Sequence, residues 1–151
     1  MVYVRFSREE IISVIPHRPP FLLIDSIQEV RFKKRGVGIK AIGPSDDFIE
    51  GYRADRRVMP RTLFVEALAQ TAAFVVAGEK LLPGAEREKY PTIGYLVRVG
   101  DFTFSGDAKE GDTLRLEVEL ISSLGNIFKF RGAVEVGGKE ICTGDLTFSV
   151  Y

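Results

Sequence analysis

One segment, residues 60–80, constrains the fold of this chain more than any other. It is apolar on nearly every side over the length of a long helix, yet Glu66 stands in the middle of it. A helix that is apolar all round is normally buried, and a carboxylate within it needs a partner because burying it bare is costly. The segment therefore predicts a central core helix, opened by Pro60 and ended by Pro83 and Gly84.

This predicted helix carries one polar stripe. Thr62, Glu66 and Gln70 follow each other at intervals of four residues and therefore share one face. Glu66 is a candidate functional group; the structural alternative is a carboxylate paired with Arg61 or with an arginine of a partner subunit. For Gln70 the structural alternative is to satisfy nearby backbone groups.

The segments on either side of the helix have the patterns of antiparallel strands. Residues 21–32 and 37–42 predict a hairpin around a basic turn, and a meander of about four strands follows Pro91. In the last strand Cys142 falls on the apolar face, which indicates a core residue and not a nucleophile. One principal helix against one antiparallel sheet predicts a single α+β domain over residues 1–151.

Two further segments connect these elements. Ser7 and Glu10 have the spacing of a capping box, which predicts a short helix over residues 7–15, and a proline-rich linker with His17 follows it. Residues 43–59 show neither helical nor strand periodicity and predict a loop of about 17 residues. Loops of this length in compact domains are usually functional or disordered.

Composition excludes several classes of function. Lys+Arg and Asp+Glu both number 21, which argues against nucleic-acid binding through bulk charge. One cysteine rules out an internal disulfide framework, and one histidine with one cysteine argues against an all-protein zinc site. No signal sequence and no membrane-spanning apolar run is evident, so we expect a cytoplasmic protein.

Several separate motifs then occur in a recognisable order. They are IPHRPPFLLID at 15–25, VMP at 58–60, EALAQ at 66–70, GDTLRLEV at 111–118 and IFKFRG at 127–132. Over nearly the whole chain they resemble the hotdog-fold β-hydroxyacyl-(acyl-carrier-protein) dehydratases of the FabZ/FabA type. The resemblance implies a hotdog fold, a curved antiparallel sheet wrapped around one long helix, in a homodimer or a trimer of dimers. It also implies an acyl thioester of acyl carrier protein or CoA as ligand, in fatty-acid or polyketide-type metabolism, without a cofactor or a metal.

The chain departs from the family where the family keeps its catalytic residues. In the family a loop histidine from one subunit and a helix carboxylate from the other form the catalytic pair. Here Tyr52 occupies the histidine position, although the distance to Glu66, 66 − 52 = 14 residues, is that of the family. The resemblance thus points to Glu66 and Tyr52 as the catalytic positions, and to Gly51, Arg61, Thr62 and Gln70 as substrate-binding positions.

Further differences from the family argue against assigning its dehydratase activity directly to this chain. Arg61 replaces the glycine that lets the thioester carbonyl approach, and His17 lies in the N-terminal signature instead of at the catalytic position. Tyr52 is a poor base near neutral pH because phenols ordinarily titrate near 10.

Three hypotheses remain open at this point. The first is an acyl-thioester-binding protein that lacks the standard His/Glu dehydration. The second is an active dehydratase or hydratase that uses Glu66, with its pKa raised by burial, and Tyr52. The third is a thioesterase in which Glu66 activates water. Whether the protein is an enzyme is therefore left open by the sequence.

Overall fold

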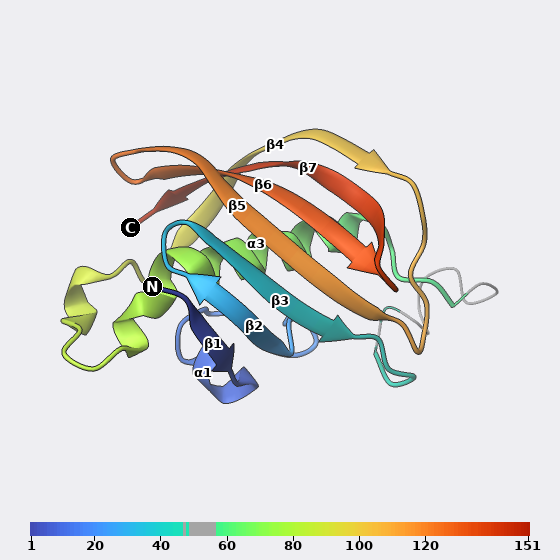
Figure 1. The fold of residues 1–151 in the computed structure, drawn as a ribbon, viewed down its shortest axis with the longest axis horizontal. Helices are drawn as coiled ribbons and strands as arrows, with labels where there is room; N and C mark the ends of the chain where they lie inside the picture. Colours follow the sequence, from blue (N-terminus) through green and yellow to red (C-terminus); the bar gives the residue numbers. More distant parts are fainter. Residues whose placement is uncertain (47, 49–56) are drawn as a thin grey trace.

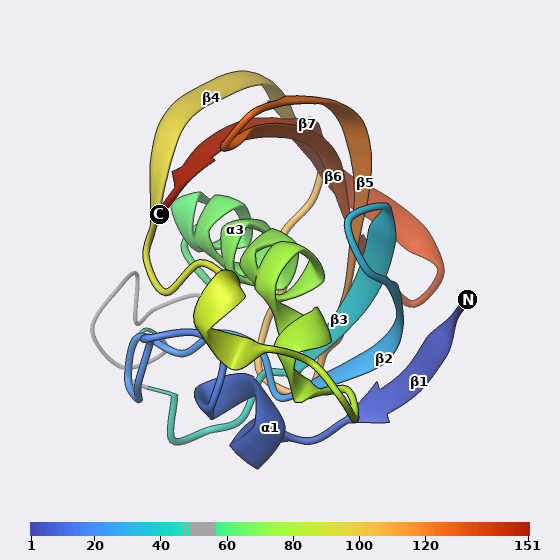
Figure 2. The same cartoon turned by 90° about the vertical axis from the view of Figure 1, so that its left-hand side faces the viewer.

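A computed structural model describes residues 1–46, 48 and 57–151 of the chain, and a seven-stranded antiparallel sheet dominates it. The sheet curls around the long helix α3, Thr62–Ala77, which runs through its concave side (Figures 1 and 2). This arrangement confirms the predicted α+β hotdog architecture. The strands are β1 Tyr3–Phe6, β2 Ser26–Arg31, β3 Arg35–Ala41, β4 Gly94–Phe104, β5 Thr113–Leu124, β6 Ile127–Val136 and β7 Lys139–Val150.

The order of the strands across the sheet is β1-β2-β3-β5-β6-β7-β4. The predicted meander is therefore present, but its first strand, β4, lies at the outer edge and pairs with the last strand, β7. Strands β2 and β3 join the meander through β3, whose Gly38 pairs with Leu116 of β5. The strand β1, which the sequence patterns did not predict, forms the opposite edge by pairing with β2.

The sheet approaches α3 closely at glycines. A Cβ atom built on Gly38 would lie 2.7 Å from Oγ1 of Thr71, and one built on Gly132 would lie 2.9 Å from a methyl carbon of Leu68. Side chains at these two strand positions would therefore push the helix away from the sheet. On the helix side, the small residues Ala67 and Ala72 have no exposed surface.

In the N-terminal region, one predicted strand is shorter than expected. The chain forms a strand only over Ser26–Arg31 and not over residues 21–32. The reason is tertiary: Leu23 donates its backbone N–H to the side chain of Gln70, and the carbonyl of Phe21 accepts from the same side chain. These backbone groups bond to α3, so they take no part in the sheet.

The two predicted helices are present with shorter bounds. Helix α1, Arg8–Ile12, begins with the predicted capping box, in which Ser7 and Glu10 bond to each other's backbone N–H. Helix α3 ends at Ala77 and continues as the 3-10 turn η1, Gly78–Leu81; a second short turn, η2, spans Arg87–Lys89. The helical stretch Thr62–Leu81 is long and apolar enough to cross a membrane, but 67% of its apolar window is buried here, as in a core helix.

Candidate functional site

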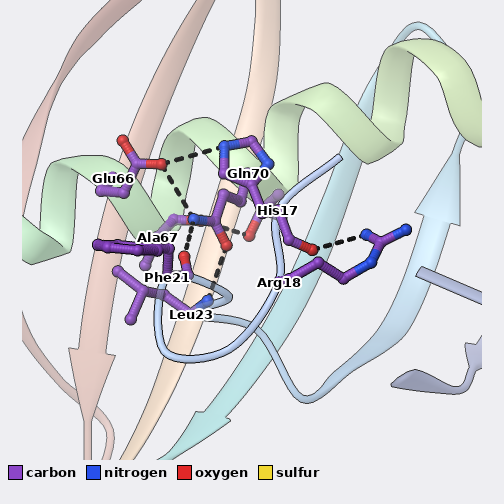
Figure 3. Close-up of polar contacts among 8 residues, drawn as sticks. His17, Arg18, Phe21, Leu23, Glu66, Ala67 and Gln70 are labelled. Carbon is purple, nitrogen blue, oxygen red and sulfur yellow. Dashed lines mark hydrogen bonds and ion pairs between the residues drawn. The ribbon is translucent and has the colours of Figure 1, made fainter. Parts of the chain in front are cut away.

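Glu66 lies in the first half of α3 and is held by two side chains. Gln70, one helical turn further on, donates from Nε2 to Oε1 of Glu66 at 3.0 Å. Nε2 of His17 lies 3.3 Å from the same oxygen (Figure 3). The carboxylate that the sequence left without a partner therefore has two, and both reach Oε1.

Gln70 is fully buried and fixes the N-terminal linker to the helix. Its Nε2 also donates to the carbonyl of Phe21 at 2.7 Å, and its Oε1 accepts from the N–H of Leu23 at 2.8 Å. The structural role considered for Gln70, satisfying nearby backbone groups, is thereby confirmed. The same amide also orients Glu66, so one side chain serves both the fold and the site.

His17 reaches Glu66 because the linker that carries it is restrained on both sides. Pro16 and the pair Pro19 and Pro20 limit the backbone around it. Arg18 donates from Nη1 to the carbonyl of His17 at 2.8 Å (Figure 3). It also donates to the carbonyl of Ile15 at 2.9 Å, which closes the turn. The other ring nitrogen, Nδ1, is buried and has no hydrogen-bond partner among the described residues.

The two contacts decide the charge of Glu66. The hydrogen bond from His17 holds the pKa of Glu66 below its usual range; burial acts in the opposite direction, and Gln70 and the charge of His17 lower the pKa further. Burial does raise the pKa of this carboxyl, but the hydrogen-bond donors outweigh it, so the net pKa lies below the usual range and not above it as the second hypothesis requires. Glu66 is a carboxylate at neutral pH and can accept a proton.

An apolar cavity of about 250 Å³ opens beside this pair. His17, Glu66 and Gln70 place polar groups in its wall. The rest of the wall comes from residues 14–16, from α3, from the region of β4 and from the end of β7, with Ala69, Ala73, Val76, Tyr95, Leu96 and Phe148 among its residues. A narrow apolar space with a carboxylate at one side suits a ligand with an alkyl chain and a polar reacting end.

Glu66 also borders a second apolar hollow, of about 240 Å³, with Pro20, Phe21 and Leu63 in its wall. Among the described residues that line these two spaces, Glu66 alone borders both. Its side chain retains 41% exposure. The carboxylate is thus reachable by a small molecule in either space.

The other predicted site residues are distributed differently. Arg61 donates to Asp107 at 2.9 Å, so the alternative in which Arg61 neutralises Glu66 is wrong. Thr62 is exposed and does not line the cavity, although it lies on the stripe of Glu66 and Gln70. Gly51 and Tyr52 lie outside the described residues, so their predicted roles stay predictions.

Other chemistries receive no support from the described part of the chain. Within it, no group of three or more His, Cys, Asp or Glu side chains could hold a metal ion. Burial raises the pKa of the Cys142 thiol to about 12, so this cysteine is protonated and packed in the core, as predicted.

Sequence reasoning missed His17 as a partner of Glu66. No spacing rule relates a residue of an irregular linker to a helix far along the chain. The available signals were that His17 is the only histidine and that Gln70, placed one turn from Glu66, needs buried partners of its own.

Known proteins resemble this chain over nearly its whole length. Residues 15–145 match the model of the FabA-like domain family. The FabZ 3-hydroxyacyl-[acyl-carrier-protein] dehydratase of Exiguobacterium sibiricum is 41% identical over 96% of this chain and 99% of its own length. The corresponding FabZ enzyme of Halalkalibacterium halodurans is 39% identical over 94% and 96% of the two chains.

Solved structures share the fold at lower identity. One is the dehydratase heterocomplex ApeI:P from Xenorhabdus doucetiae, with a TM-score of 0.78 and 18% identity over 93% of this chain and 90% of that one. Another is a hypothetical thioesterase with coenzyme A from Streptococcus pneumoniae, with a TM-score of 0.62 and 14% identity over 95% and 92%. The family match and the two relatives span nearly the whole chain, and this protein therefore belongs to the FabA-like domain family, together with the FabZ 3-hydroxyacyl-[acyl-carrier-protein] dehydratases.

Proposed function

We propose that this protein binds acyl thioesters of acyl carrier protein or CoA, with the acyl chain in the cavity beside α3 and the thioester end at Glu66. One observation carries the proposal: an oriented carboxylate, held by Gln70 and His17, stands at the wall of an otherwise largely apolar cavity. The FabZ relatives act on 3-hydroxyacyl chains carried by acyl carrier protein, as their names state, which fits a cytoplasmic role in fatty-acid or polyketide-type metabolism.

The proposal does not include the standard pairing of a loop histidine with a helix carboxylate. The chain has one histidine, and it lies in the linker before β2. The alternative dehydratase or hydratase with Tyr52 as the acid needs Tyr52 near Glu66. The thioesterase alternative needs only Glu66 and a water molecule, and a fold shared with a thioesterase does not favour that reaction.

We further propose a homodimer, or a trimer of dimers, built on the free edge of β4. Its apolar residues Tyr95, Leu96, Val97 and Val99 are all exposed, the least of them by 39%. An edge strand with exposed apolar side chains on both faces is a ready surface for strand pairing, and a two-fold dimer is the commonest way to cover it. Tyr95 and Leu96 also line the cavity, so a partner there would add to its wall.

Equilibrium binding tests the function. Purified protein is titrated with saturated acyl, 3-hydroxyacyl and enoyl thioesters of CoA and of acyl carrier protein. Ala73→Trp fills the cavity from α3 and is expected to weaken binding of medium-length chains at least about tenfold, whereas Ser123→Trp, at an exposed position of β5, leaves it unchanged. Absence of binding to every thioester would overturn the proposal.

Turnover of the same thioesters separates the reactions. Interconversion of 3-hydroxyacyl and enoyl thioesters indicates a dehydratase or hydratase, and release of free thiol from the saturated thioester indicates a thioesterase. Binding of thioesters without either reaction indicates an acyl-thioester-binding protein that has no catalytic activity on them.

A further inference from the structure

We infer that His17 and Glu66 of one subunit form a proton-transfer pair for interconverting 3-hydroxyacyl and enoyl thioesters, in place of the histidine that the loop lacks. The inference rests on the proposed function, since it needs an acyl thioester in the cavity. His17 thereby takes part in the chemistry, a role that is implied neither by its position in the linker nor by the family match.

The positions of His17 and Glu66 give both side chains access to the cavity. His17 and Glu66 both line the cavity, and their side chains are 33% and 41% exposed, so both are reachable from it. The distance of 3.3 Å between Nε2 and Oε1 is short enough for a proton to pass between them after small adjustments. Both residues belong to one chain, so the pair is complete without a second subunit.

Each of the two groups keeps one polar atom without a hydrogen-bond partner in the described part of the chain. Both contacts to the carboxylate reach Oε1, which leaves Oε2 without a hydrogen-bond partner among the described residues. On the histidine, Nδ1 is buried and has no hydrogen-bond partner in the same part of the chain, so the contact of Nε2 with Glu66 is the sole polar pairing of the ring there. A histidine kept only for structure is normally bonded through its buried nitrogen. His17 is aimed at Glu66 and is held in place by its backbone.

The reaction balances with these two groups alone. The carboxylate of Glu66 takes the proton from C2 of the 3-hydroxyacyl thioester, and the electrons of the C2–H bond form the C2–C3 double bond. The C3–O bond breaks, and the leaving hydroxyl takes a proton from the imidazolium of His17 and departs as water. The proton on Glu66 then moves to Nε2 of His17, which restores the ion pair; hydration runs through the same steps in reverse.

His17→Gln is the decisive variant. The amide of glutamine can still donate a hydrogen bond to Glu66, but it cannot transfer a proton. We expect enoyl hydration, followed by the loss of enoyl absorbance, to fall at least about 100-fold, the usual contribution of acid–base catalysis, with KM and thermal midpoint nearly unchanged. His17→Gly should regain part of its activity when free imidazole is added, a response that a purely structural role would not give.

A second readout follows the C2 proton. In heavy water the wild-type protein is expected to place deuterium at C2 during hydration, and His17→Gln and Glu66→Gln are each expected to suppress this. Full turnover in His17→Gln, or failure of imidazole to restore any activity to a folded His17→Gly, would overturn the pair. A wild-type protein that binds enoyl thioesters but does not hydrate them would overturn the pair and leave the proposed function intact; absence of binding would overturn the function itself.

Discussion

His17 and Glu66 meet across the space between the N-terminal linker and the central helix, with 3.3 Å between Nε2 and Oε1. The contact gives the carboxylate of this apolar helix a defined orientation and lowers its pKa. Gln70 reinforces it from the next turn of α3 and anchors the linker that carries His17. Because the site and the packing of the linker share these bonds, stability and binding can be tested with neighbouring substitutions.

Replacing Gln70 with leucine is expected to destabilise the fold. The substitution leaves the N–H of Leu23 and the carbonyl of Phe21 without their partner, and each lost partner costs about 1–3 kcal/mol. Urea unfolding should therefore show a loss of about 2–6 kcal/mol in the free energy of unfolding. The matched control is Gln28→Leu at an exposed position of β2, and equal losses in both variants would contradict this account.

The pH dependence of stability should reveal the ionised state of Glu66. Its pKa is lower in the folded than in the unfolded chain, so its contribution is fully present above the ordinary value of 4.5 and is lost as the pH falls through the folded pKa. The stability advantage of the wild type over Glu66→Gln should shrink as acid is added below that value. Chemical unfolding of both proteins over a series of acid buffers measures this difference. A difference that stays constant, or that grows in acid, would mean that the folded pKa is not lowered.

Gly38 should not tolerate a side chain. The new Cβ in Gly38→Ala would lie 2.7 Å from Oγ1 of Thr71, a buried residue that cannot easily move. Overpacking of this kind typically costs about 1–3 kcal/mol, measurable as a lower thermal midpoint. Gly100→Ala serves as the comparison, because the nearest atom to its Cβ is the flexible end of Arg98 at 3.7 Å. Similar thermal midpoints for the two variants would contradict the close approach of α3 and β3.

The ion pair of Arg61 and Asp107 should contribute little to stability. The side chain of Arg61 is 45% exposed, and exposed pairs contribute about 0–1 kcal/mol. We expect Arg61→Ala to unfold within about 1 kcal/mol of the wild type, as seen by urea titration. Acyl-thioester binding by the same variant tests the predicted role of Arg61 at the thioester end. A clear loss of affinity with unchanged stability would support that role, and unchanged affinity would remove it.

The free edge of β4 should hold two chains together. Light scattering is expected to give an assembly of at least twice the chain mass of 16.8 kDa. Val97→Lys places a charge on the exposed edge and should shift the mass toward that of one chain, because an edge lysine opposes strand pairing. Ser122→Lys on β5 is the control for added charge. An assembly unaffected by Val97→Lys would place the interface elsewhere.

Much of the architecture could be read from local patterns. The apolar run around Glu66 predicted α3, the capping box predicted the start of α1, and alternation predicted strands β5 to β7. These predictions hold because helix and strand periodicity depend on neighbours in the sequence. The stripe that paired Glu66 with Gln70 was predictable for the same reason, since residues four apart on a helix are neighbours.

Local patterns thus establish the α+β class, the central helix and Glu66 as a candidate functional group. Which group faces that carboxylate depends on how the whole chain folds. It placed His17 there and paired Arg61 with Asp107, and it drew residues 21–23 out of the sheet toward Gln70. It also moved the pKa of Glu66 downward, against the expectation from burial. These four features have the same cause. Hydrogen bonds and ion pairs depend on distances that are set by the path of the irregular segments, and helix or strand periodicity does not predict that path.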